Sequence, residues 1–64
     1  MRLVNKSKTA TVLECTPEEL AMIGNALNES LEVIEEWEFA ARMGATRAEV
    51  EELLATLSRL QPPE

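Results

Sequence analysis

Apolar side chains recur at helical spacing through the middle of the chain. From residue 20 to residue 34 they advance by steps of three or four: Leu20, Ile23, Leu27, Leu31 and Ile34. This period puts them on one stripe of an α-helix, with asparagine and glutamate on the other side. The stripe follows Thr16-Pro17-Glu18-Glu19, in which threonine caps, proline takes the first helical position and glutamate stands three residues after the cap. The pattern predicts one long amphipathic helix over residues 16–35.

A second helical stripe occupies the C-terminal third of the chain. Thr46-Arg47-Ala48-Glu49 repeats the capping pattern, and Gly44 favours the left-handed conformation that ends a preceding helix. The apolar positions that follow are Val50, Leu53, Leu54, Leu57 and Leu60, and Pro62 and Pro63 stop the helix. We predict a helix-turn-helix unit over residues 36–60 and a tail over residues 61–64.

Residues 1–15 are predicted to be extended. The run from Thr9 to Cys15 is rich in β-branched residues, and residues 5–8 (Asn-Lys-Ser-Lys) suit a turn. A two-stranded hairpin is only marginally stable alone. Residues 1–15 should therefore form a hairpin or arm that packs on the helices or pairs with a second chain.

Together these segments predict a single small α+β domain, mostly α, over residues 1–64. The expected core is Leu13, Leu20, Ile23, Leu27, Leu31, Ile34, Met43, Val50, Leu53, Leu54 and Leu57. Trp37 and Phe39 would lie about 200° apart on a helix, so they cannot share one narrow core. One of them should cover the joint between helices while the other meets a partner.

The size of the chain favours self-association. A domain of 64 residues buries a small fraction of its surface. One cysteine and no histidine rule out an internal disulfide and disfavour a zinc site. We therefore expect a homodimer, which would add the stability that the small core of one chain does not provide.

Charge is unevenly distributed along the chain, which has a net charge of −6. The charged side chains of residues 1–8 are all basic. Residues 9–41 contain eight glutamates and no basic residue. The acidic stretch is either a solvated helix face or a surface that steers a basic partner. Nucleic acid is disfavoured as a partner because its phosphates require lysine and arginine.

No apolar run approaches the length of a membrane span, and the first residues lack the apolar region of a leader peptide. We expect no membrane partner and a location in the bacterial cytoplasm, where the free thiol of Cys15 suits a reducing compartment.

Residues 39–54 resemble a helix-turn-helix motif, with Ala40, Gly44, Val50 and Leu53 at the spacing of such units. The face of the second helix that would enter DNA carries Arg47, Ala48, Glu49, Glu51 and Glu52. Three carboxylates there would repel phosphates. Arg42 is placed either to contact a phosphate or to pair with Glu38. We predict helix-turn-helix geometry without DNA binding.

Asn25, Asn28 and Glu29 share one side of the long helix and form the most suggestive polar cluster. They make either a specific contact or none, because solvent-facing asparagines cost little. Glu32, Glu35 and Glu36 have no histidine or tyrosine beside them, so we expect no enzymatic activity, no cofactor and no metal.

Three sequence patterns carry a family resemblance: Thr16-Pro17-Glu18-Glu19-Leu20, then Asn25-Ala26-Leu27-Asn28-Glu29, then Trp37-Glu38-Phe39 with Arg42 and Gly44. Over residues 16–60 the chain resembles a group of small bacterial proteins of unknown function. It is also similar to the C-terminal part of immunity proteins of bacterial toxin systems. This resemblance implies an acidic protein that neutralises a basic toxin, and it transfers no functional residues.

The sequence as a whole predicts a non-enzymatic protein-interaction module that self-associates and has an acidic face. The alternatives are a toxin-neutralising inhibitor of a basic protein and, disfavoured by its acidic second helix, a transcriptional regulator. The candidate partner-binding residues are Asn25, Asn28, Glu29, Glu32, Glu36, Trp37, Phe39 and Arg42.

Overall fold

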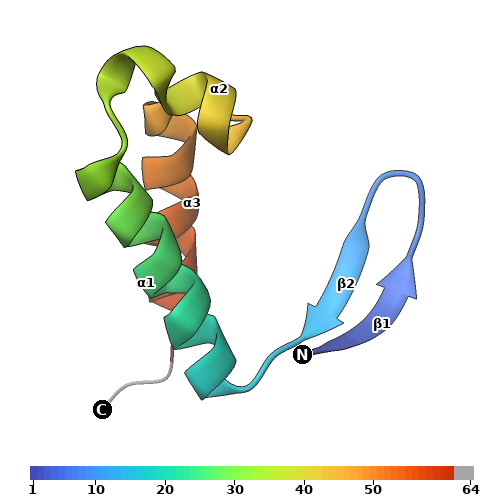
Figure 1. Ribbon diagram of the computed structural model, residues 1–64. Coiled ribbons are helices and arrows are strands. Elements are labelled where there is room, and N and C mark those ends of the chain that lie inside the picture. Colours follow the sequence, from blue (N-terminus) through green and yellow to red (C-terminus); the bar gives the residue numbers. More distant parts are fainter. Residues whose placement is uncertain (62–64) are drawn as a thin grey trace.

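A computed structural model describes residues 1–61 as an antiparallel hairpin followed by helices (Figure 1). In chain order the elements are β1 (Arg2–Lys6), β2 (Thr11–Glu14), α1 (Pro17–Val33), the 3-10 helix η1 (Glu36–Glu38), α2 (Phe39–Met43) and α3 (Arg47–Leu60). The predicted class, α+β and mostly α, is confirmed. The prediction that Pro62 and Pro63 stop the last helix lies outside the described residues.

Both predicted helix starts are confirmed as complete capping boxes. The Thr16 hydroxyl accepts from the Glu19 amide at 3.1 Å, and the Glu19 carboxylate accepts from the Thr16 amide at 2.9 Å. Thr46 and Glu49 repeat this exchange at 3.1 and 2.8 Å. Gly44 has a φ of 72°, which is the left-handed conformation expected where α2 ends. Local sequence therefore determines where α1 and α3 begin.

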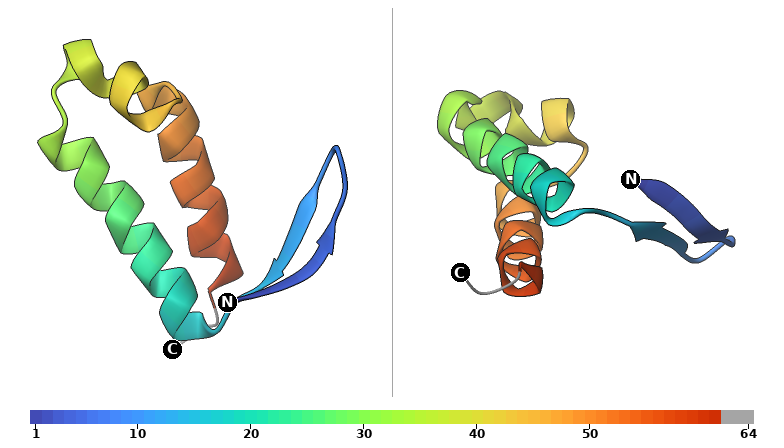
Figure 2. Two further views of the ribbon diagram at one scale, coloured as in Figure 1. Left: turned by 45° about the vertical axis from the view of Figure 1, so that its right-hand side comes forward. Right: turned by 90° about the horizontal axis from the view of Figure 1, so that it is seen from below.

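Helices α1 and α3 pack side by side and antiparallel, and η1 and α2 cross one end of the pair (Figures 1 and 2). Gly24 is buried where the two helices meet. A Cβ atom on Gly24 would lie 3.8 Å from Cδ1 of Leu54. Within residues 1–61, neither face of the pair is covered by a further layer of structure (Figure 2).

The core is smaller than predicted. Among the described residues, two hydrophobic side chains are buried, Phe39 at 1% exposed and Val50 at 4%. Leu13 and Leu53 were expected in the core, and this is wrong because they are 48% and 49% exposed. The other predicted core positions are half-buried: Leu20, Ile23, Leu27, Leu31, Ile34, Met43, Leu54 and Leu57. A single layer of two helices leaves the outer side of each apolar stripe open.

The hairpin projects away from the helices (Figure 1), and every residue of both strands is exposed. The expected turn at residues 5–8 is wrong by two positions. Ser7 donates its amide to the Ala10 carbonyl at 2.8 Å, and its hydroxyl accepts from the Ala10 amide at 3.1 Å. Lys6 instead pairs with Thr11 inside the sheet. The hairpin does not pack on the helices, so pairing with a second chain stays a prediction.

The molecule is flat, with dimensions of 36 × 35 × 15 Å. Its radius of gyration is 13.2 Å, against about 11 Å for a compact domain of this length. Its accessible surface is 5205 Å², against about 4,100 Å² for a compact protein of this mass. The chain alone therefore leaves far more surface exposed than a compact domain does.

Candidate interaction surfaces

Arg47 is the centre of the joint between α1, η1 and α3. Its guanidinium donates from Nη1 to the Leu31 carbonyl at 2.7 Å and from Nη2 to the Ile34 carbonyl at 3.2 Å. Its Nε donates to the Glu36 carboxylate at 2.6 Å, and its Cζ lies 4.7 Å from the centroid of the Phe39 ring. Because carbonyls at a helix C-terminus lack partners and carry partial negative charge, this cation closes the end of α1.

This position corrects the placement of Arg47 on the outer face of the helix-turn-helix unit. The side chain turns inward, and its guanidinium donates to the carbonyls at the end of α1. Of the four residues at helix-turn-helix spacing, Ala40 and Leu53 are exposed. Val50 and Gly44 fulfil their expected roles. Residues 36–60 therefore have the turn of a helix-turn-helix motif. The main packing contact between helices is, however, the one between α1 and α3.

The candidate residues of the joint have different environments. Trp37 is 82% exposed, whereas Phe39 is buried, so Phe39 is wrong as a partner-binding residue and is a core residue instead. Glu36 is held by Arg47. Arg42 pairs with Glu38 at 2.9 Å, which is the ion pair offered by the sequence as one of two roles for this arginine. Trp37 alone among these four has no ion-pair or core contact in the described part of the chain.

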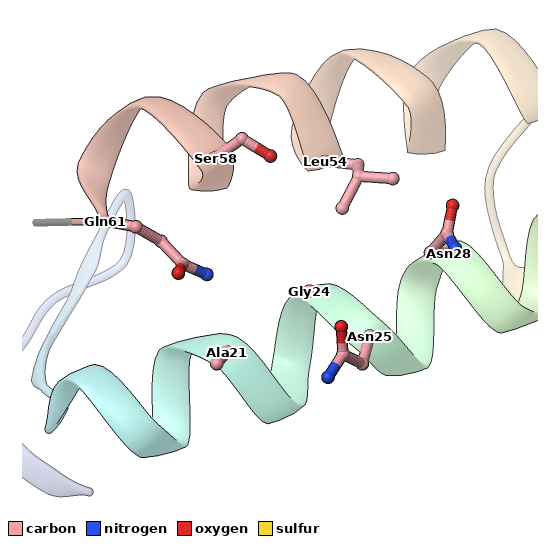
Figure 3. Close-up of a pocket in the computed structure, with 7 residues that line it drawn as sticks. All are labelled: Ala21, Gly24, Asn25, Asn28, Leu54, Ser58 and Gln61. Atoms are coloured by element: carbon pink, nitrogen blue, oxygen red, sulfur yellow. The ribbon is translucent and has the colours of Figure 1, made fainter. Parts of the chain in front are cut away.

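A shallow groove lies between α1 and α3 (Figure 3). It has a volume of about 240 Å³ and is lined by Ala21, Gly24, Asn25, Asn28, Leu54, Ser58 and Gln61. The structure thus brings Asn25 and Asn28 together, beside Ser58 and Gln61 of the opposite side of the groove. Glu29, predicted to belong to the same cluster, does not line it.

Glu29 and Glu32 are exposed on α1 and make no ion pair within residues 1–61. The acids that do have cationic partners are Glu14 with Arg2, Glu19 with the amino group of Met1, Glu36 with Arg47, and Glu38 with Arg42. The middle of α1 consequently presents negative charge that no base in the described part of the chain neutralises.

The glutamates of the two capping boxes both have lowered pKa values. The amino group of Met1, followed by the Thr16 amide, holds the pKa of Glu19 below its ordinary value of 4.5. The Thr46 amide, followed by the Thr46 hydroxyl, holds the pKa of Glu49 below 4.5 as well. Both groups are therefore more firmly ionised than a free glutamate, and both act on helix stability rather than on a site.

The structural roles of two residues, Gly24 and Arg47, were not predicted from the sequence, although each left a signal. Gly24 stands in the middle of a strong helical pattern, where glycine is unfavourable, and in the structure it lies at the contact between α1 and α3. Arg47 stands in the first turn of α3, where the helix dipole disfavours a cation. A basic residue at that end of a helix indicates a partner elsewhere in the fold.

Within residues 1–61 the structure contains no group of three or more side chains arranged to hold a metal ion. None of the helices in that range has the length and the apolar character needed to cross a membrane. Comparisons of the chain with protein-family models, with curated proteins and with solved structures found no match.

Proposed function

We propose that the chain is a non-enzymatic protein-interaction module that self-associates as a homodimer. The observation that carries the proposal is its open surface. The accessible area exceeds that of a compact protein of the same mass by about 1,100 Å². A standard interface buries about 800 Å² on each partner. One such interface would bring the exposed area of each copy near that of an ordinary domain.

The groove supports a binding role that does not involve catalysis. Its volume of about 240 Å³ lies below the range of about 300–1,000 Å³ that small-molecule pockets occupy. Its lining consists of carboxamides, a hydroxyl and aliphatic groups, with no titratable side chain to act as acid or base. We place the module in the cytoplasm, where its half-buried thiol, Cys15, would stay reduced.

Self-association is tested by co-expressing two copies of the full chain that carry different affinity tags. Purification through the first tag should recover the second copy at near-equal amount, because the two copies form mixed dimers. Recovery of the first copy alone, at micromolar concentration, would contradict the proposal.

A second proposal concerns a basic protein partner, as an immunity-type inhibitor would require. It is favoured by Glu29 and Glu32, which are exposed beside the groove residues Asn25 and Asn28 and unpaired in the described chain. Opposite charges increase the rate of association more than they increase affinity. The acidic side of α1 would therefore attract and orient a basic surface.

This second proposal is tested on the association rate of the partner recovered from the native organism. Glu29→Gln with Glu32→Gln should slow association at low salt. The matched control, Glu18→Gln with Glu52→Gln, removes the same charge elsewhere and should slow it less. Equal association rates for the two double variants would mean that Glu29 and Glu32 have no specific role in attracting the partner. Glu36 is unsuitable for this test because its loss would also release Arg47.

We do not extend the proposal to DNA binding. Arg47 donates to α1, Arg42 pairs with Glu38, and the outer side of α3 carries Glu49, Glu51 and Glu52. Few cations are left there to neutralise phosphates.

A further inference from the structure

Helices α1 and α3 contact each other at Gly24 and Leu54 (Figure 3). On either side of this contact line, each helix has one flank. With about 100° of rotation per residue, Asn25 and Asn28 lie on one flank of α1 and Ser58 lies on one flank of α3. These three residues line the same groove. The two flanks that carry them therefore belong to one face of the flat molecule, here named the polar face.

Six aliphatic side chains occupy the opposite flank of the same two helices. This apolar face consists of Leu20, Ile23 and Leu27 from α1, and Leu53, Leu57 and Leu60 from α3. Each set of three spans an arc of about 60°. Each also has the alternating steps of three and four that helices use to pack along a common seam.

The apolar face is incompletely covered in the single chain. Leu53 and Leu60 are 49% and 64% exposed, and the other four side chains are half-buried. Helices η1 and α2 lie across the far end of the pair, and the hairpin projects away from it (Figure 2). Partly exposed aliphatic side chains that gather on one face are typical of a site of protein association.

The distribution of charge indicates what covers this face. Glu32 and Glu51 lie on the flank of the polar face, and Glu29 lies on the outer side of α1. The seam of the apolar face contains no charged side chain, and Glu49 lies at its edge. A basic partner would be attracted to the opposite side of the molecule. A second copy, although it also has a net charge of −6, can approach the apolar face without burying an acid within the seam.

We propose that the apolar face is the interface with a second copy of this chain, and that the two helix pairs stack across it as a four-helix bundle. This proposal rests on the proposed self-association and adds the surface and the architecture. A twofold axis would place the same six side chains of each copy against each other. The polar face, with its groove and its unpaired glutamates, would then point outward on both sides of the dimer.

The test compares two double variants of the full chain by sedimentation over a range of concentrations. Leu53→Ala with Leu60→Ala truncates the apolar face, and Leu3→Ala with Leu13→Ala truncates two leucines of the hairpin. All four side chains are exposed in the single chain, so circular dichroism should show that the helices are retained. The apolar-face variant should raise the Kd of the dimer at least tenfold, since buried interface leucines are lost. The hairpin variant should leave it within about twofold.

A second measurement does not depend on a variant folding. When the wild-type chain is diluted through its Kd, the methyl resonances of Leu53 and Leu60 should shift and those of Leu3 and Leu13 should not. A dimer that resists truncation of the apolar face, or whose shifts map to the hairpin, would overturn this interface and leave self-association intact. A wild-type chain that is monomeric at every concentration would overturn both proposals.

Discussion

At the scale of single residues, Arg47 has the largest share of specific contacts. One guanidinium satisfies two carbonyls at the end of α1, pairs with Glu36 and stacks on Phe39. Lysine could not reproduce this, because a single ammonium lacks the planar fork that reaches several acceptors. The helix α1 has no basic residue in its own last turn, so the cation comes from the next long helix instead.

Arg47→Ala should lower the free energy of unfolding by about 1.5–3 kcal/mol, the range for hydrogen bonds made by a charged group. The matched control is Arg42→Ala, which removes an exposed pair spaced i, i+4 and should cost about 0.5 kcal/mol. Urea denaturation followed by circular dichroism measures both. Equal losses for the two variants would mean that Arg47 does not close α1.

Truncation of the two aromatic residues, Phe39 and Trp37, should have very different effects on stability. Phe39→Ala should cost about 3–5 kcal/mol, enough to unfold much of so small a domain, because Phe39 fills the core. Trp37→Ala should change the free energy of unfolding by no more than about 0.5 kcal/mol, because Trp37 is exposed. The same denaturation experiment compares them. The sequence predicts that these two side chains separate, but the 3-10 turn that decides which is buried has no local sequence signal.

Acid should weaken the helix caps. The pKa values of Glu19 and Glu49 are lowered in the folded chain, so their contribution to stability is complete above 4.5 and is lost as the pH falls through the folded values. Thermal unfolding should therefore occur at a lower temperature at about pH 3 than at about pH 6. Glu49→Gln retains a cap without a titrating group and should reduce this difference. An unchanged pH dependence in that variant would exclude Glu49 as a contributor.

At the scale of elements, the glycines have opposite roles. Gly24 lies inside α1 with a normal helical backbone, and an added methyl would make ordinary contact with Leu54 at 3.8 Å. Gly24→Ala should therefore stabilise the fold by about 0.8 kcal/mol, through helix propensity. Gly44 has a φ of 72°, so Gly44→Ala should destabilise by about 1–2 kcal/mol. Thermal melts of the two variants should shift in opposite directions, and a loss of stability in Gly24→Ala would mean that the helices pack more closely than described.

Some features of these elements are determined by the local sequence, and others are not. The starts of α1 and α3 follow from four-residue capping patterns, and the end of α2 follows from Gly44, so all three could be predicted. The turn of the hairpin could not, because Ser7 closes it through bonds to Ala10, while the more usual turn former Asn5 joins the sheet. The irregularity between Leu3 and Asn5 then sets the register of the strands.

At the scale of the whole molecule, periodicity identifies the apolar positions but does not say what covers them. Leu13 and Leu53 have the pattern of core residues and are exposed in the single chain. Asn25 and Asn28 were identified as a polar cluster, whereas their neighbours across the groove, Ser58 and Gln61, come from a segment about 30 residues away. Such contacts depend on how α1 and α3 align, which no local pattern specifies. The leftover apolar surface is explained if a second copy completes the core.

The mass of the wild-type chain in solution tests this explanation most directly. Sedimentation equilibrium at micromolar to high micromolar concentration should give twice the chain mass of 7.1 kDa, with dissociation on dilution. A mass of 7.1 kDa at every concentration, with the helices intact, would show that the flat single layer is stable alone and would contradict self-association.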